Sequence, residues 1–357
     1  MKFSKLLVTL IFLFSTLFSF SQNAEEETKI IKEGIVLHDN GNYKAAIKKY
    51  DKVLKINNTN MIAWAEKAYS LMEAKKYNQA IECCQKAIEI APKNEDISNL
   101  YTSYANVLDL VGKPRESLKI YEEAIDLYPQ NYMLLFNKGI THSGLREDEL
   151  AIECMQHSMV IYSGHAGTQN ALARILYGKG KNVPSLMAFA LFFVNEPQSA
   201  RAKQNIPLIQ SLISGNAHKD KKTNAINISL SSIPDSDEAK SENDFSMTTM
   251  ILELQGALNL SEELSDQSDR EKFLKSFNTF CNSLEETQEG NFGFYWEFYA
   301  PFFIEMNENN MTETFSHLVF STTNEKEFKN WMKTNKPDVI KFYDWVKAYD
   351  WPLIEVE

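Results

Sequence analysis

One stretch of sequence decides the fold of this chain. Residues 66–92 read EKAYSLMEAKKYNQAIECCQKAIEIAP. In the unit that begins at Met61, small residues occupy the eighth, twentieth and twenty-seventh positions, a larger one the twenty-fourth, and a proline the thirty-second. These five residues are Ala68, Ala80, Ala87, Cys84 and Pro92. Their order predicts two short antiparallel helices that pack tightly against each other.

The same order of small and large residues recurs about every 34 residues along the N-terminal part of the chain. Five units begin at Glu27, Met61, Ser98, Tyr132 and Ala166. Their eighth position is always glycine or alanine, which lets the two helix backbones of a unit approach closely. Because neither helix pair could bury its apolar face alone, successive pairs must stack. The pattern resembles the tetratricopeptide repeat over residues 27–199.

The resemblance implies an all-α fold, a tetratricopeptide-type α-solenoid of five helix–turn–helix repeats. Pro207 stands where the next unit would need a small residue, so the periodicity ends there. We expect a helix from Ile206 to Ser214 to cap the array, since a terminal repeat needs a cover for its apolar face. The array with its cap then takes residues 27–214. Arrays that look like this one hold a protein or peptide partner and need no cofactor.

In proteins that resemble the array, the leading helix of each repeat lines a concave groove through positions two, five, nine, twelve and thirteen. The candidate groove residues are Ile31, Ile35, Tyr69, Asn106, Phe136, Ile140, Asn170, Arg174 and Tyr177. Tyr69 and Phe136 either anchor a partner through their rings or pack within the array. Arg174 beside Asn170 either binds a carboxylate or lies on a solvated helix face. Members that hold the acidic C-terminus of chaperones carry lysine and asparagine where this chain has isoleucines, so we do not expect that activity.

The first residues have the anatomy of a secretory signal peptide. Lys2 and Lys5 precede an apolar run from Leu6 to Phe20, and cleavage is expected after Ser21. The alternative is an uncleaved anchor, but the run is shorter than the roughly 20 residues that span a bilayer. The sequence thus predicts a signal peptide over residues 1–21 and an exported, periplasmic or secreted protein. No transmembrane segment is expected in the mature chain.

The charge of the chain argues against nucleic acid as a partner. The 357 residues include 37 basic and 48 acidic ones, and loss of the signal peptide removes two lysines, which leaves 35 − 48 = −13. Binding a phosphate backbone requires concentrated lysine and arginine. The four cysteines form no CxxC pair, and we expect free thiols.

The composition changes after the array. Residues 215–245 are polar and predict a flexible linker, with one short strand over Asn227 to Ile233 as the alternative. Residues 246–357 predict a separate helical domain of no recognised family, and 19 aromatic residues lie between Phe277 and Trp351. These rings either form a core or present a binding face for sugars or peptides. Candidates for such a face are Tyr295, Trp296, Tyr299, Trp345 and Trp351.

No catalytic or metal-binding motif stands out. The six histidines include no i, i+4 pair around a glutamate, and the chain has no GxSxG elbow. The sequence therefore predicts a noncatalytic adaptor that binds a protein or peptide partner in the groove, with no metal and no cofactor. The alternative makes the aromatic region a carbohydrate-binding or peptide-binding module and the repeats a spacer.

Overall fold

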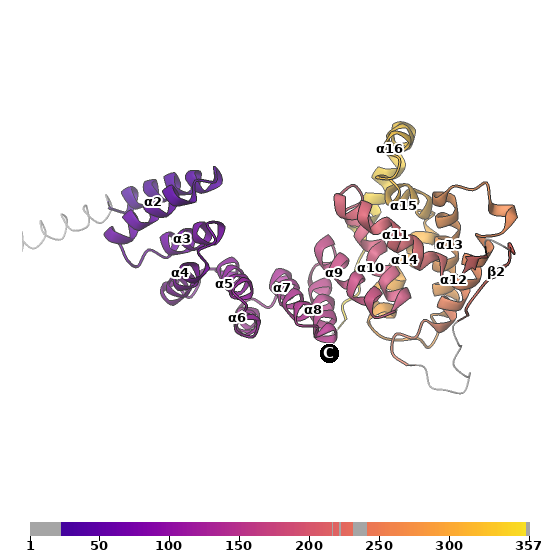
Figure 1. Cartoon of the computed structure of the whole chain (residues 1–357), viewed down its shortest axis with the longest axis horizontal. Helices are drawn as coiled ribbons and strands as arrows, with labels where there is room; N and C mark the ends of the chain where they lie inside the picture. The colour runs from indigo at the N-terminus through magenta and orange to yellow at the C-terminus, as the bar shows by residue number, and fades with distance from the viewer. Residues whose placement is uncertain (1–22, 216, 221–222, 231–240, 355–357) are drawn as a thin grey trace, which may run out of the picture. The chain divides into compact units, whose positions relative to one another are not determined.

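The computed structural model describes residues 23–215, 217–220, 223–230 and 241–354 (Figure 1). The predicted signal peptide lies outside these residues, and so does part of the predicted linker. The chain forms two compact units, residues 1–141 and residues 142–357, which are described one at a time as unit 1 and unit 2. Among the described residues, no helix is both long enough and apolar enough to cross a bilayer.

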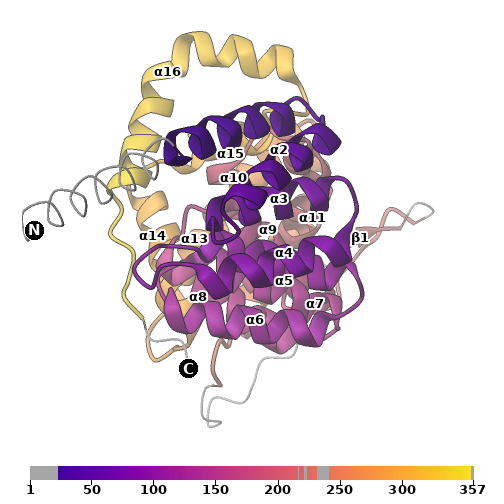
Figure 2. The same cartoon turned by 90° about the vertical axis from the view of Figure 1, so that its left-hand side faces the viewer.

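Unit 1 is built from successive helix pairs. A helix over residues 23–39 precedes α2 (Tyr43–Ile56), α3 (Met61–Glu73), α4 (Tyr77–Ile90), α5 (Ser98–Leu110), α6 (Pro114–Leu127) and α7 (Tyr132–Gly144), whose last turn belongs to unit 2. Figure 2 shows α2 to α6 stacked in order from top to bottom. The predicted helical repeats are confirmed, and α3, α5 and α7 begin at the first residue of their predicted units.

Local sequence explains where these helices start and stop. Gly41 and Gly112 take the left-handed backbone conformation in the turns inside the first and third repeats, where a side chain would be strained. The Asn60 side chain accepts a hydrogen bond from the backbone N–H of Ala63 at 2.9 Å and so caps α3. Pro114 occupies the first position of α6, where its missing N–H costs nothing.

Packing inside the repeats follows the small and large positions of the sequence. Ala68 and Ala105, at the eighth position, are fully buried. Tyr50 and Tyr121, at the twenty-fourth position, are fully buried as well. A Cβ atom on Gly34 would lie 2.5 Å from the Tyr50 ring, so the two helices of the first repeat touch at this point. The repeat is therefore a contact pattern as well as a sequence pattern.

Unit 2 begins with the rest of the array and continues through the C-terminal helices. Its helices are α8 (Asp148–Ile161), α9 (Ala166–Gly178), α10 (Asn182–Asn195), α11 (Ala200–Ser214), α12 (Ser246–Leu258), the 3₁₀ turn η1 (Glu262–Leu264), α13 (Asp269–Thr287), the π-helix η2 (Tyr295–Tyr299), α14 (Ala300–Glu308), α15 (Thr312–Val319) and α16 (Glu325–Ala348). In α16 the backbone departs from helical geometry at Asn335, two residues before Pro337.

The capping helix is longer than predicted. It begins at Ala200, six residues before Ile206, because the Ser199 side chain accepts a hydrogen bond from the N–H of Ala202 and opens the helix there. Pro207 lies inside α11. In the predicted linker, β1 (His218–Lys219) and β2 (Ile226–Asn227) form a two-residue antiparallel hairpin.

The helix α10 lies at the centre of unit 2. All twelve residues from Val183 to Val194 are buried, so this helix has no solvent face. It contacts α9 and α11 from the array and α12, α15 and η2 from the C-terminal region. A helix that is apolar all round must be covered on every side. The end of the repeat array and the C-terminal helices therefore share one core. The division into two domains by a linker over residues 215–245 stays a prediction.

The aromatic residues of the C-terminal region form much of that core. Phe277 packs between Phe303 and Phe315, with ring centroids 6.0 and 4.8 Å away. The Trp351 ring stacks on Phe302 at 5.0 Å. Such offset and edge-to-face contacts are the arrangements that aromatic pairs prefer. The aromatic-rich helical region predicted from the sequence is thus present, and most of its rings are used for packing.

Replacing Gly256 by alanine should destabilise unit 2. The added Cβ would lie 1.8 Å from the carbonyl oxygen of Ser214, where α12 crosses the end of α11. We expect a loss of about 1–3 kcal/mol in the free energy of unfolding, measured by urea denaturation. The matched control is Gly178→Ala, a helical glycine with open space around it, which should be neutral or stabilise by about 0.5–1 kcal/mol. Equal effects of the two variants would contradict this packing.

The stability of unit 2 should fall in acid because of His317. Its ring stacks on Trp331 at 3.9 Å, and burial, helped by the Arg270 charge, lowers the pKa of His317 to about 4. The unfolded chain takes up this proton near pH 6.5 while the folded chain does not. Stability is therefore lost as the pH falls from about 6.5 to about 4, by roughly 2–3 kcal/mol. The His317→Phe variant should lose this part of the pH dependence in thermal melts; an unchanged profile would show that His317 titrates normally.

Candidate functional site

Six of the nine candidate groove residues lie in unit 1, and their burial differs. Ile31 is buried in the core of the first repeat, and Ile35 packs against that core. Tyr69 is half-buried and packs against the core that the second and third repeats share. Asn106 accepts a hydrogen bond from the Tyr121 hydroxyl. The side chains of these four residues therefore contribute, at least in part, to packing or hydrogen bonding within the repeats.

The remaining two, Phe136 and Ile140, lie on α7. Phe136 is half-buried, whereas the side chain of Ile140 is 44% exposed. Two further apolar residues of the leading helices are exposed in the same way, Ile62 by 49% on α3 and Leu110 by 61% on α5. They occupy positions two and thirteen of their repeats, which are groove positions in the family. Sequence analysis did not single them out, although the position count alone points to both.

The leading helix α3 also carries a carboxylate that the repeat contacts do not use. Glu66 on α3 is half-buried and has no hydrogen bond or ion pair with any described residue. Burial raises the pKa of Glu66, against the effect of His38. Its charge in turn helps to raise the pKa of Tyr69 to about 12, an effect second to that of burial. Position six, which carries Glu66, is absent from the groove positions taken from the family, and sequence analysis therefore missed it.

Polar pairs join each repeat of unit 1 to the next. They connect position twenty-five of one repeat with position seven of its successor. The pairs are Asp51 with Lys67 at 2.7 Å, Gln85 with Tyr104 at 2.8 Å, and Glu122 with Lys138 at 3.5 Å. The first and third are exposed ion pairs that add about 0–1 kcal/mol each, so their main effect is on register. Each pair joins a trailing helix to the next leading helix, and together the pairs hold the leading helices in a regular row.

Hydrogen bonds between leading helices add to this row. The Nδ1 atom of His38 lies 2.8 Å from the Oγ atom of Ser70, and the Thr141 hydroxyl donates to Asp109. Both bonds connect position twelve of one repeat with position ten of the next. The leading helices of unit 1 are thus connected by side chains that the fold already uses, and the exposed apolar residues and Glu66 take no part in these contacts.

The other three candidate residues lie in unit 2 and all reach α11. Arg174 donates a hydrogen bond from Nη2 to Oδ1 of Asn205 at 2.7 Å. Asn205 donates from Nδ2 to Oδ1 of Asn170, also at 2.7 Å. The Tyr177 hydroxyl lies 3.5 Å from the Ser211 hydroxyl. These contacts attach α9 to the capping helix, and because Arg174 remains exposed, its other N–H groups can still meet a ligand.

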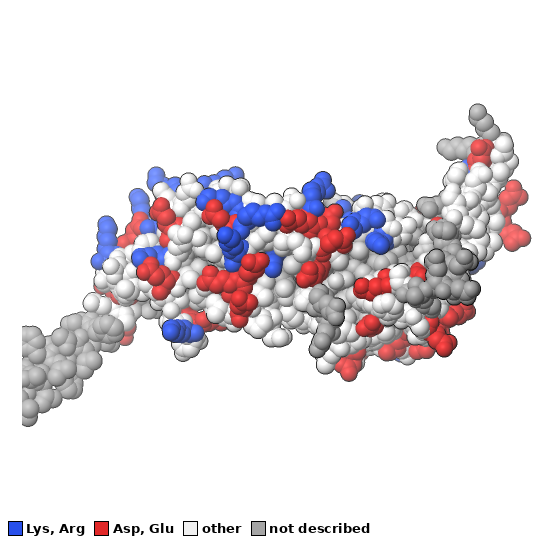
Figure 3. All heavy atoms as spheres, turned by 90° about the horizontal axis from the view of Figure 1, so that it is seen from below, with Lys and Arg blue, Asp and Glu red and all other residues white. Residues whose placement is uncertain are grey.

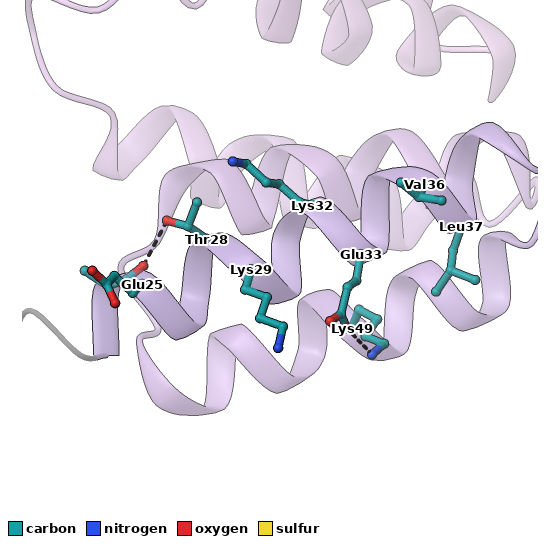
Figure 4. Close-up of a pocket in the computed structure, with 9 residues that line it drawn as sticks. Glu25, Thr28, Lys29, Lys32, Glu33, Val36, Leu37 and Lys49 are labelled. Atoms are coloured by element: carbon teal, nitrogen blue, oxygen red, sulfur yellow. Dashed lines mark hydrogen bonds and ion pairs between the residues drawn. The ribbon is translucent and has the colours of Figure 1, made fainter.

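An open hollow of about 1060 Å³ lies along the helix over residues 23–39 (Figure 4). Lys29 and Lys32 surround it, and Glu33 forms an ion pair with Lys49 there. Among its lining residues only Thr28 occupies one of the five groove positions. The hollow is therefore distinct from the predicted groove. In the described part of the chain no three His, Cys, Asp or Glu side chains are placed to hold a metal ion.

These helix pairs define the class of the molecule: it is a helical-repeat protein. The sequence model of the tetratricopeptide repeat family matches residues 59–130. The chain therefore carries tetratricopeptide repeats, as its sequence predicted. The match covers the four helices from α3 to α6.

Proteins similar to this chain are similar over the repeats. The small glutamine-rich tetratricopeptide repeat-containing protein 2 of Saccharomyces cerevisiae is 32% identical over 114 residues, which are 30% of this chain and 32% of that protein. The STIP1 homolog of Dictyostelium discoideum is 28% identical over 114 residues, 32% of this chain and 20% of that protein. This chain thus spans a third or less of each relative. The solved structure of PilF from Pseudomonas aeruginosa is 22% identical and covers 52% of this chain and 84% of its own, with a TM-score of 0.46.

Replacing Asn205 by alanine should loosen the capping helix. Asn205 is fully buried, and its loss would leave Asn170 without its donor and Arg174 without its acceptor. We expect a cost of about 1–3 kcal/mol in urea denaturation, the penalty for an unsatisfied buried polar group. Gln204→Ala, at the exposed neighbouring position, should change stability by less than about 0.5 kcal/mol. A similar effect of both variants would mean that the network contributes nothing.

Proposed function

We propose that this chain is an exported, noncatalytic adaptor that holds a peptide or protein segment on the leading helices of its tetratricopeptide repeats. One observation carries the proposal. The exposed large apolar side chains Ile62, Leu110 and Ile140 lie on three successive leading helices of unit 1, and each occupies a groove position of the family. The fold does not need them there, because its contacts use other positions.

The energetics favour a partner at this place. Covering apolar surface is worth roughly 25 cal/mol per Å², so three side chains of this size can supply several kcal/mol to binding. Large exposed apolar patches mark interaction sites more often than single exposed apolar residues do. Tyr69 and Phe136 lie on the same helices and offer half-buried rings as anchors. Glu66 adds a point charge that can orient the bound segment.

Export and the absence of catalysis rest on the sequence. The signal peptide over residues 1–21 supports a periplasmic or secreted location. No nucleophile, base and orienting group have motif spacing, which supports a binding role. The partner is a protein or peptide, and the negative charge of the mature chain disfavours nucleic acid.

The alternative, a sugar-binding or peptide-binding face of aromatic rings in the C-terminal region, finds less support. Tyr295, Trp296 and Tyr299 are buried, and Trp345 and Trp351 stack on Phe302. Rings that pack on one another in a core cannot stack on a sugar. The contacts of these rings therefore favour a structural role for the region.

The test is capture of partners by the whole mature chain, residues 22–357, from an extract of its native cell envelope. The double variant Ile62→Asp with Ile140→Asp places charges at two exposed apolar positions and should reduce capture of specific partners at least tenfold. The readout is quantitative mass spectrometry of the captured proteins. The fold should be kept, because each side chain is nearly half-exposed and neither belongs to a buried core.

The control is Leu127→Asp with Leu150→Asp, which adds the same charges at residues of similar exposure on the trailing helices α6 and α8. Capture by this variant should equal that of the unchanged chain. If both double variants lose the same partners, or neither does, the leading helices do not form the binding face.

A further inference from the structure

Unit 2 contains a polar cavity that the proposed adaptor role does not use. Its volume is about 750 Å³, within the range of small-ligand sites. One wall consists of α8 together with the turn between α9 and α10. The other consists of residues 242–243 and 292–297, which are remote from α8 in sequence, and Ile354 closes one side. The cavity thus exists only because the C-terminal region folds against the fourth and fifth repeats within unit 2.

The second wall is firmly built. The N–H of Asn243 donates to the carbonyl of Phe292 at 2.9 Å, and the Asn243 side chain accepts from the N–H of Tyr295 at 2.9 Å. Gly293 takes a φ of +103°, and a Cβ atom there would lie 2.6 Å from the Glu242 side chain. Only glycine fits this conformation and this approach. The wall then continues into the π-helix η2, a rare element that is frequent at functional sites.

The charges around the cavity are predominantly negative. Glu149 and Lys179 form an ion pair at 2.7 Å and neutralise each other. This leaves three further carboxylates, those of Glu153, Glu242 and Glu297, against the single ammonium group of Lys181. Glu153 is exposed on α8 and makes no hydrogen bond or ion pair with any described residue. The cavity therefore repels anions and attracts cations.

The net charge of unit 2 also favours the binding of cations. Residues 142–357 contain 19 basic and 31 acidic residues, a net charge of −12, whereas residues 1–141 carry a net charge of +1. On the face drawn in Figure 3, both signs are interspersed over the repeats, and acidic side chains predominate toward the C-terminal helices. Such a field raises the local concentration of cationic ligands and speeds their binding at low ionic strength.

A buried hydroxyl adds an observation that is independent of the carboxylates. Tyr295 is only 4% exposed, and its hydroxyl makes no hydrogen bond of regular geometry with the described residues, although the Gln156 side chain lies close enough to offset part of the rise that burial causes in the pKa of Tyr295. The charges of Glu149 and Glu242 add to the effect of burial in raising the pKa of Tyr295. Tyr295 thus borders the cavity and carries a buried hydroxyl whose hydrogen-bonding capacity is not fully used.

The apolar part of the lining completes the chemistry. The ring of Phe292 is 45% exposed at the cavity, and Ile152 and Ile354 lie nearby. A guanidinium or ammonium group is attracted to the face of such a ring, while its aliphatic stem covers apolar surface. A planar guanidinium also pairs with carboxylates through two hydrogen bonds. Carboxylates and an exposed aromatic ring around one cavity match a basic side chain.

We propose that this cavity binds a basic peptide segment, whose arginine or lysine side chain enters between α8 and the loop from Phe292 to Glu297. The site lies in unit 2 and is separate from the apolar residues on the leading helices of unit 1. The chain then has two binding sites of different chemistry, one for an apolar segment and one for a basic residue.

The test uses the whole mature chain and blocked heptapeptides, acetylated and amidated, with one central residue varied. A peptide with arginine should bind at least tenfold more tightly than one with citrulline, which keeps the length and planar shape but lacks the charge and replaces one donor nitrogen with a carbonyl oxygen. Affinity is measured by isothermal titration calorimetry at low salt. Glu153→Lys and Phe292→Ala should each weaken arginine-peptide binding at least fivefold. Both residues are exposed, so the fold should be retained.

The matched control is Glu286→Lys, which makes the same change of charge at an exposed position of α13 outside the cavity lining. It should leave the affinity within twofold. Equal binding of the arginine and citrulline peptides, or equal loss with Glu153→Lys and Glu286→Lys, would overturn the proposal, and so would an oligosaccharide that competes for Phe292. The Ile62→Asp, Ile140→Asp variant should bind the arginine peptide normally, which separates this site from the proposed adaptor face.

Discussion

Each helix pair in this chain must bury an apolar face against the next pair, and the rest of the structure depends on that constraint. Within unit 1 it is met by repetition, with alanine or glycine at the close approach and tyrosine or cysteine between pairs. At the end of the array repetition stops, yet α10 still has apolar residues on all sides. The C-terminal helices meet that need, since α12, α15 and η2 cover α10. The aromatic region is thus the cover of the last repeat as well as a structure of its own.

This arrangement separates residues that maintain the fold from residues that remain available. Positions eight and twenty-four are buried, and positions seven and twenty-five form polar pairs between repeats. The exposed positions of the leading helices then carry Ile62, Leu110 and Ile140 without any internal role. A regular row of helices presents such residues at regular intervals, which suits an extended segment of another chain.

The two units differ in chemistry. Unit 1 is nearly neutral by sequence and exposes apolar side chains, whereas unit 2 is strongly acidic and encloses a polar cavity. Apolar contact gives affinity with little dependence on salt, while a cation in an acidic cavity is recognised through charge and geometry. An adaptor with both kinds of site can select a partner by two independent properties.

The sequence by itself determined the repeats, their first residues and the helical, aromatic-rich character of the C-terminal region. These features depend on local spacing, because the helical period places residues three and four apart on one face. The sequence also contains the continuous apolar run of α10, whose burial on all sides sequence analysis did not predict. Only the tertiary structure decided how the groove positions are used: Asn170, Arg174 and Tyr177 form hydrogen bonds that reach α11, while Ile62 and Leu110 stay about half-exposed. It alone also formed the cavity between Glu153 and Phe292, because residues that far apart in the chain become neighbours only when non-local packing brings their helices together.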